Sequence, residues 1–331
     1  MQNLDKHVIS QALQWLHNGE PIWLCTVLAT FGSSPREPGS LMAATPDGKH
    51  VGSLSGGCVE EDFLQQLGDG RFQKTVERIR YGAEGNMGNN RVTLPCGGSL
   101  DVLIEKLAPT PANTEHLQNL LATLDGKAVK TRRVVLDDSK ESNATSLLHD
   151  QPQSERVWLD PDERFVDIRV GPVSRLIIAG VSSVSIYCAE FALAMGFEVI
   201  ICDPREEAWA NVNMPGIRAE YVLPSLFIAA PDACHHATAI VGLTHDPRID
   251  DLAMIEAVQT PAFYIGVMGS HKTSQTRAER LQRTGGLTAA EVARIHMPIG
   301  LALGSKTPAE IALAVMADIL RVQRGKERNA L

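Results

Sequence analysis

The chain has 331 residues, of which 44% are hydrophobic and 21% charged, a composition typical of a globular protein with enough length for two domains. Its formal net charge of −8 argues against nucleic acid or an anionic membrane surface as the main partner. Residues 1–21 lack the basic start and apolar core of a signal peptide, and no apolar run reaches the roughly 18 residues of a membrane span. We therefore expect a cytoplasmic protein.

The first half of the chain predicts a mixed α and β domain. Apolar residues at helical spacing indicate a helix over 5–18, and the strands that follow are separated by a loop rich in glycine and proline and by a hairpin turn at 46–49. A second helix is expected over 59–67. Residues 108–156 look the most variable, and their polar stretch 137–155 predicts an exposed loop.

The second half predicts a doubly wound, Rossmann-like α/β domain. An apolar strand at 175–179 leads through Gly180 into an apolar helix, and the next strand ends at Asp203, about twenty residues beyond the first turn. Dinucleotide-binding folds place an acidic ribose ligand at that point. We place the boundary so that the first domain spans 1–171 and the second 172–331.

The glycine-rich fingerprint of a nucleotide-binding turn is incomplete in this domain. After Gly180 the chain reads Val181, Ser182 and Ser183, where further glycines would let the backbone approach a pyrophosphate. Ser182 could still cap the helix, whose free amides could hold a phosphate. In the alternative interpretation, this unit is a scaffold without bound NAD.

Six cysteines are spread along the chain without a C-x-x-C pair, which fits neither a disulfide framework nor a zinc ribbon. Cys25, Cys188 and Cys202 lie in apolar runs, so we expect them to be small buried hydrophobic residues. Cys234 precedes two histidines and is a weak candidate for metal binding.

Cys58 stands at an expected helix start, directly after Gly56 and Gly57. The helix dipole and free backbone amides stabilise a thiolate at such a position, so we expect this thiol to be accessible and reactive.

Cys96 is followed by Gly97 and Gly98, which keep side chains away from the thiol. Together with the Cys58 loop, this arrangement predicts a shared pocket for a flat or bulky ligand, and soft thiolates suit a soft metal centre. In the alternative, both loops are tight turns with incidental cysteines.

Two other regions offer polar groups to a ligand. Residues 32–40 contain serine hydroxyls, including that of Ser34, and the guanidinium of Arg36, as an anion-binding loop would, although an ordinary loop fits equally well. In the second domain, several polar residues are expected near the carboxyl ends of strands, where open α/β sheets bind ligands. These are His245, Asp246, Ser270, His271, Lys272, Arg277 and His296.

The combination of these motifs resembles the XdhC/CoxI family of accessory proteins for molybdenum hydroxylases such as xanthine dehydrogenase. In the first domain the resemblance rests on GSSPREPGS, GSLSGGCVEEDF and LPCGGSLDVLIE. In the second it rests on GFEVIICDPRE, THDPRIDD, YIGVMGSHKT and RIHMPIGLALGSKTPAEIALAVMADIL. It spans nearly the whole chain except the region around 108–156.

The resemblance implies a chaperone that binds the molybdenum cofactor, helps it to receive sulfur from a cysteine desulfurase and delivers it to an apo-hydroxylase. It points to Cys58 and Cys96 as the thiols near the metal, with the glycine pairs at 56–57 and 97–98 shaping their loops. A chaperone without turnover of its own is favoured over an enzyme. The cofactor could be the plain pterin or a dinucleotide form, and a homodimer is plausible.

The turn after Gly180 departs from the family pattern, in which a glycine-rich loop is followed by histidine. This departure leaves nucleotide binding by the second domain open. Two other functions remain as alternatives. One is an NAD(P)-dependent oxidoreductase, which the incomplete glycine loop disfavours, and the other is a zinc or redox protein that uses Cys58 and Cys96.

Overall fold

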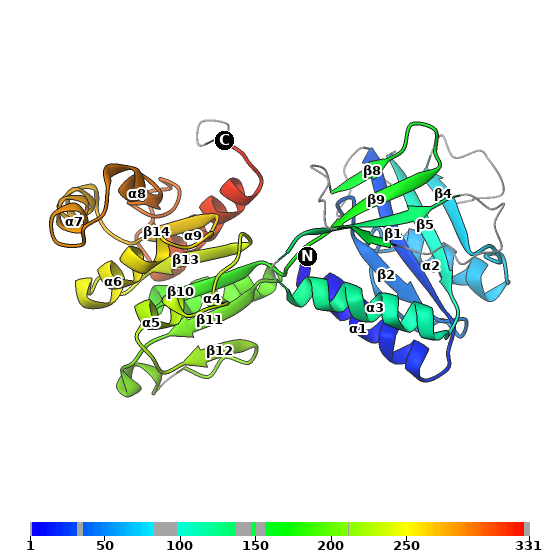
Figure 1. Cartoon of the computed structure of the whole chain (residues 1–331), viewed down its shortest axis with the longest axis horizontal. Coiled ribbons are helices and arrows are strands. Elements are labelled where there is room, and N and C mark those ends of the chain that lie inside the picture. The colour runs from blue at the N-terminus through cyan, green and yellow to red at the C-terminus, as the bar shows by residue number, and fades with distance from the viewer. Residues whose placement is uncertain are drawn as a thin grey trace. The chain divides into compact units, whose positions relative to one another are not determined.

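The computed structural model describes residues 2–31, 36–82, 98–126, 128–136, 147–149, 156–210 and 212–327. The chain divides into unit 1, Met1–Pro172, and unit 2, Val173–Leu331. Figure 1 shows both units, with the helices and strands labelled where there is room.

Unit 1 is built on a five-stranded antiparallel sheet with the order β3-β2-β1-β5-β4. Its strands are β1 (Ile22–Phe31), β2 (Leu41–Ala44), β3 (His50–Gly52), β4 (Val76–Gly82) and β5 (Ser99–Leu107). Because side chains alternate along a strand, Cys25 and Val27 of β1 pack on α2 (Cys58–Gly68), whereas Leu24 packs with α1 (Gln2–His17) and α3 (Pro111–Asp125). The sheet is therefore buried on both faces.

A four-stranded antiparallel sheet completes unit 1, with the order β7-β6-β9-β8. Its strands are β6 (Lys130–Val135), β7 (Leu147–His149), β8 (Val157–Leu159) and β9 (Phe165–Val170). Strand β7 lies within the stretch that the sequence predicts as a loop. Three residues are too few to show a strand period, and Leu148 packs beside the core that α1 and α3 form.

A buried ion pair joins the two sheets. Arg132 of β6 donates from Nη2 to both carboxylate oxygens of Glu105 in β5, at 2.7 and 2.8 Å. Arg132 also donates from Nε to His116 Nε2 at 3.1 Å. Burial, with a smaller contribution from the Arg132 charge, lowers the pKa of His116 to about 3, so this imidazole is a neutral acceptor.

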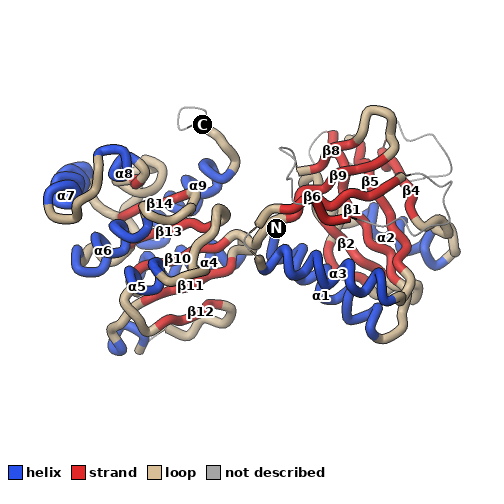
Figure 2. Tube along the Cα trace, in the orientation of Figure 1, coloured by secondary structure: helices blue, strands red, loops and turns tan. Residues whose placement is uncertain are grey.

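Unit 2 is a doubly wound domain around a six-stranded parallel sheet with the order β12-β11-β10-β13-β14-β15. The strands are β10 (Arg175–Ala179), β11 (Glu198–Cys202), β12 (Ile217–Glu220), β13 (Thr238–Gly242), β14 (Tyr264–Val267) and β15 (Ile295–His296). Figure 2 shows the helices surrounding this sheet.

Helices cover both faces of the parallel sheet. One face packs against α4 (Ser183–Ala194) and α9 (Pro308–Gln323). The other packs against α5 (Pro224–Ala229), α6 (Pro247–Ala257), α7 (His271–Arg283) and α8 (Ala289–Ala293), and a 3₁₀ turn, η1 (Glu206–Trp209), follows β11. The prediction of a mixed α and β domain followed by a Rossmann-like domain is confirmed.

The helices of the described chain include none that is both long and apolar enough to span a membrane.

Candidate cofactor site

The strands of the five-stranded sheet bring the described residues that flank the candidate loops of unit 1 to one end of the sheet. Phe31, the last residue of β1, pairs with Ser99, the first residue of β5, and Ser99 pairs with Gly82 at the end of β4. At the same end Gly52, the last residue of β3, pairs with Met42, next to the start of β2. The flanking residues of segments 32–40, 53–57 and 83–98 therefore meet at a common end of the sheet.

Several predicted site residues belong to these segments. Ser34, Cys96 and Gly97 lie outside the described residues. Arg36 is half-buried, and Gly98 is buried against Gly82, whose added Cβ would lie 2.2 Å from the Gly98 carbonyl oxygen. The structure thus brings the ends of the predicted loops together at one end of the sheet, and it displays Cys58 there.

Cys58 is the exposed cysteine among those that the structure describes. It is the first residue of α2, one position earlier than the predicted helix start, and Gly57 is the N-cap. A Cβ added to Gly57 would have no neighbouring atom within 4 Å, so the surface beside the thiol is open. Gly56 has a φ of +90°, a conformation that favours glycine.

The other described cysteines are buried or half-buried. Cys25, Cys188 and Cys202 are buried in the cores, which confirms their prediction as hydrophobic residues. Burial raises the pKa of Cys188 and Cys202 to about 12 and that of the half-buried Cys234 to about 11. These thiols are therefore not poised as nucleophiles at neutral pH.

Glu60, in the first turn of α2, holds the Cys58 turn in place. Its Oε1 accepts hydrogen bonds from the amides of Leu54, Ser55 and Gly56 at 2.7 to 2.9 Å. Its Oε2 accepts from the amide of Gly57 at 2.9 Å. The hydroxyls of two serines add bonds of 2.6 and 2.7 Å; these are Ser53 and Ser55.

These contacts keep Glu60 ionised. Burial alone would raise the pKa of this carboxyl, but the hydrogen bonds from Ser53, Ser55 and Gly56 outweigh it and hold the pKa well below its usual range. The sequence predicts free amides around Cys58. That expectation is wrong for the amides of residues 54–57, which Glu60 occupies. The spacing of an N-cap and a glutamate at N3 was the signal that could have revealed this role.

The turn after β10 in unit 2 is closed by protein contacts. Gly180 has a φ of +84°, and an added Cβ would lie 1.9 Å from the Thr244 methyl carbon. Thr244 follows β13, the other strand at the point where the strand order reverses and open sheets usually bind ligands. The two loops therefore touch where a crevice would be expected.

Asp203 is fully buried next to this turn. Its Oδ2 accepts from the Val181 amide at 2.7 Å and from Arg205 Nη2 at 2.6 Å. Its Oδ1 accepts from the amide and Nε of Arg205, both at 2.9 Å. Burial opposes ionisation, but Arg205 and the Val181 amide lower the pKa of Asp203. Four bonds match the acceptor capacity of one carboxylate.

Ser182 is the N-cap of α4 and accepts from the Ser185 amide at 3.1 Å, as the sequence predicts for a capping serine. Gly180, Ser182 and Asp203 thus belong to one local network.

Family models match both units. The model described as the XdhC and CoxI family matches residues 15–82, which include the Cys58 turn, and the XdhC Rossmann domain matches residues 176–319. The chain belongs to the XdhC and CoxI family. Cys96, Gly97 and Gly98 fall between the two matched ranges.

Relatives of this XdhC-family chain align over nearly its full length. It is 27% identical to the molybdenum cofactor insertion chaperone PaoD of Escherichia coli (strain K12), over 98% of this chain and 90% of that protein. It is 26% identical to a probable xanthine dehydrogenase subunit of Bacillus subtilis (strain 168), over 96% of this chain and 97% of that protein.

A solved structure shows the same fold. The crystal structure of a protein described as a xanthine dehydrogenase from Bacillus halodurans aligns with a TM-score of 0.72 at 21% identity, covering 98% of each chain.

Three of the polar residues that the sequence places at the edge of the XdhC Rossmann domain hold its local structure together. Asp246 and Ser270 cap α6 and α7. Arg277 is buried and donates to Asp251 Oδ1 at 2.8 Å and to the Met268 carbonyl oxygen at 2.7 Å. His245 is exposed with a φ of +65°, and His271 and Lys272 are exposed in the first turn of α7.

His296, in the last strand of the XdhC Rossmann domain, belongs to a partly buried cluster. Its ring stacks on Tyr264 with centroids 4.3 Å apart, and its Nδ1 lies 3.3 Å from Asp318 Oδ2. Asp318 also accepts from the Tyr264 hydroxyl at 2.9 Å and from Arg321 Nε at 2.8 Å. This arrangement ties α9 to the edge of the sheet.

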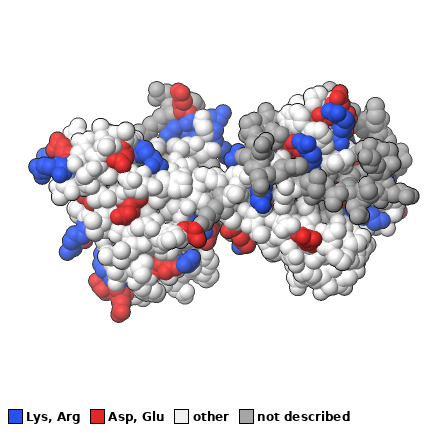
Figure 3. All heavy atoms as spheres, viewed as in Figure 1, with Lys and Arg blue, Asp and Glu red and all other residues white. Residues whose placement is uncertain are grey.

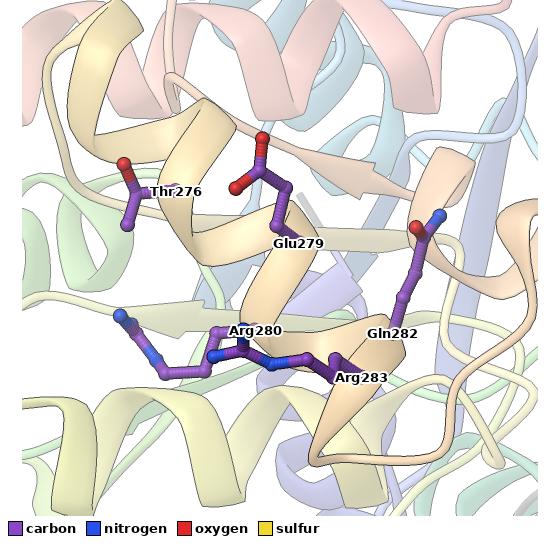
Figure 4. A pocket seen from close by; sticks show the side chains of 5 residues that line it. All are labelled: Thr276, Glu279, Arg280, Gln282 and Arg283. Atoms are coloured by element: carbon purple, nitrogen blue, oxygen red, sulfur yellow. The ribbon is translucent and has the colours of Figure 1, made fainter.

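A surface hollow on α7 does not involve any predicted site residue. It is lined by Thr276, Glu279, Arg280, Gln282 and Arg283, side chains of a single helix that carry both charges (Figure 4). On the face shown in Figure 3, acidic and basic side chains of the described residues are interspersed, without a broad basic area. Within the described ranges, no three His, Cys, Asp or Glu side chains group as a metal site.

Proposed function

We propose that this chain binds the molybdenum cofactor, supports its sulfuration and delivers it to an apo molybdenum hydroxylase of the xanthine dehydrogenase type. The names of the relatives in Escherichia coli and Bacillus subtilis support the cofactor and the client. The observation that carries the proposal in this chain is the exposed Cys58 thiol, held on a rigid turn with open surface beside it. A cysteine desulfurase is the proposed source of sulfur.

The donor chemistry of the Cys58 turn fits such a cofactor. A thiolate is a soft ligand that suits molybdenum better than it suits magnesium or calcium. When bound, the cofactor supplies the molybdenum centre that its client enzyme needs. We propose that Cys58 and Cys96 contact the metal, and that Gly56, Gly57, Gly97 and Gly98 keep side chains away from it.

The other predicted residues have supporting roles in this proposal. Ser34 and Arg36 belong to the segment that joins β1 and β2 at the same end of the sheet as Cys58, where Arg36 can attract an anionic part of the cofactor. Gly180, Ser182 and Asp203 are proposed as a second contact region in unit 2. There, a nucleotide has to displace Arg205 before it can reach the Asp203 carboxylate.

The test is the cofactor content of protein purified from cells that make molybdenum cofactor. Molybdenum, zinc and released pterin are assayed in the wild type, Cys58→Ala and Cys96→Ala, with Cys234→Ala as a cysteine control. We expect pterin in the wild type and in the control, and a loss of about tenfold or more in the other two variants.

Two results contradict the proposal. One is the absence of pterin from the wild type even after incubation with free cofactor, and the other is full retention of pterin by both Cys58→Ala and Cys96→Ala. Tight NAD binding with hydride transfer, or stoichiometric zinc without pterin, would support one of the two alternative functions.

A further inference from the structure

The turn that precedes Cys58 has the form of an anion-binding nest. The amides of four consecutive residues, 54–57, converge on one point together with two serine hydroxyls. Successive amides that point inward around a concavity bind phosphate and similar anions in many proteins. With its centre empty, this turn would therefore compete for any phosphate-bearing ligand.

The centre is filled by the Glu60 carboxylate of the same chain. Glu60 is only 7% exposed, and all its contacts with the turn measure between 2.6 and 2.9 Å. Such short bonds to a charged acceptor are among the stronger hydrogen bonds in proteins. A second anion at this point would be repelled by the carboxylate and would find its donors already occupied.

Glu60 also fixes the position of Cys58. The carboxylate belongs to α2, two residues after Cys58, and its partners lie on residues 53–57, directly before Cys58. The backbone is therefore restrained on both sides of the thiol, while the thiol itself stays exposed. The neighbouring Glu61 is exposed and makes no such contacts among the described residues.

We propose that Glu60 is a positioning and selectivity residue. Its carboxylate occupies the anion nest permanently, so that the turn contacts a ligand with the Cys58 thiol and does not bind a phosphate group of that ligand. For the cofactor this statement rests on the proposed function. It means that the metal end of the cofactor faces Cys58 and that its phosphate binds elsewhere.

The experiment uses the full chain without cofactor, in a Cys96→Ser background. Hydrogen exchange of the amides of residues 54–57 is followed in the parent protein, in Glu60→Ala and in Glu61→Ala as the matched control. Inorganic phosphate is the anion probe, with chloride at equal ionic strength for comparison. Acetate and neutral acetamide are the rescue probes, because Glu60→Ala removes a group of that size.

We expect phosphate to leave the exchange of these amides unchanged in the parent and in Glu61→Ala. In Glu60→Ala the exchange should accelerate by about tenfold or more, and phosphate or acetate should slow it again while acetamide does not. A role in packing alone would not distinguish acetate from acetamide.

The proposal is overturned if phosphate protects the amides of residues 54–57 in the parent protein, or if acetate and acetamide act equally on Glu60→Ala. Should Glu60→Ala fail to fold, protection of these amides by phosphate in the parent protein still overturns the proposal. Because no cofactor is used, a failure of this proposal is distinct from a failure of cofactor binding.

Discussion

The Cys58 turn of unit 1 and the Gly180 turn of unit 2 use the same parts in different ways. Each connects a strand to the N-terminus of a helix, and beside each lies a buried carboxylate that accepts hydrogen bonds from the backbone amides of the turn. The Glu60 carboxylate is stabilised by hydrogen bonds from amides and hydroxyls alone, whereas Asp203 is also paired with the Arg205 guanidinium.

The difference lies in what each turn leaves accessible. At the first turn the Glu60 carboxylate accepts hydrogen bonds from the backbone amides of residues 54–57, and the thiol of Cys58 remains exposed. At the second, Thr244 packs on Gly180 and the Ser182 hydroxyl caps α4. A strand-turn-helix motif is therefore a general frame, and the residues at the turn determine which groups it presents.

The contact between Gly180 and Thr244 can be broken by one methyl group. Gly180→Ala should lower the free energy of unfolding of unit 2 by about 4 kcal/mol, because the cost of a positive φ for alanine adds to the cost of the steric overlap with Thr244. Denaturant titration measures this loss. Gly286→Ala is the control, since Gly286 has a φ of +73° in open space and should lose only about 1 kcal/mol. Equal losses would mean that the loops do not touch.

The charge of Glu60 can be removed with little change in shape. Glu60→Gln should lower the free energy of unfolding by about 3 kcal/mol at pH 7, because an amide replaces an oxygen that accepts hydrogen bonds. Because the pKa of Glu60 is lowered in the folded protein, its ionised carboxylate stabilises the fold fully above pH 4.5, the ordinary pKa of a glutamate. This stabilisation is lost as the pH falls through the pKa that Glu60 has in the folded protein. The difference between Glu60→Gln and wild type should therefore shrink in acid; a constant difference would contradict this.

Arg205→Ala tests the pairing at the second turn. The variant leaves the Asp203 carboxylate buried with only the backbone donors at Val181 and at residue 205, so the free energy of unfolding should fall by about 2 kcal/mol. Thermal denaturation at pH 7 measures the change. Arg248→Ala is the control, because Arg248 is 87% exposed beside Asp246 and should change stability by less than about 0.5 kcal/mol.

The smallest effect on stability is expected at Cys58. Cys58→Ala should change the free energy of unfolding by less than about 0.5 kcal/mol, since the side chain is exposed. In a Cys96→Ser background, iodoacetamide should modify Cys58 before Cys188 and Cys202, and peptide mapping reads the order. Early modification of either buried cysteine would show that its core opens more readily than the structure indicates.

The fold could be predicted because it depends on periodic patterns. Alternating and continuous apolar runs reveal the strands, and the glycine at position 180 marks the turn of the parallel unit. Strand β7 could not be predicted, because three residues are too few to show the alternation of apolar and polar residues that marks a strand. Its strand conformation depends on pairing with β6, which is distant in sequence.

The candidate site could be predicted only in part. The glycines beside Cys58 indicate an open turn, and the structure shows the thiol exposed there. The only sequence signal for the partner of the surrounding amides is the glutamate three residues after Gly57, and composition alone does not show that Glu60 folds back onto them. Asp203 likewise has the sequence position of a ribose ligand, but in the structure its carboxylate is paired with Arg205, and the sequence does not show this contact.

The division of the chain at a single point has a consequence for synthesis on the ribosome. Every strand and helix of unit 1 precedes residue 173, so this unit can fold while unit 2 is still being translated. Unit 2 is complete only after α9 has been synthesised, because this helix packs with α4 over one face of the sheet. The nascent protein can therefore complete the turn that exposes the Cys58 thiol well before α9 has left the exit tunnel.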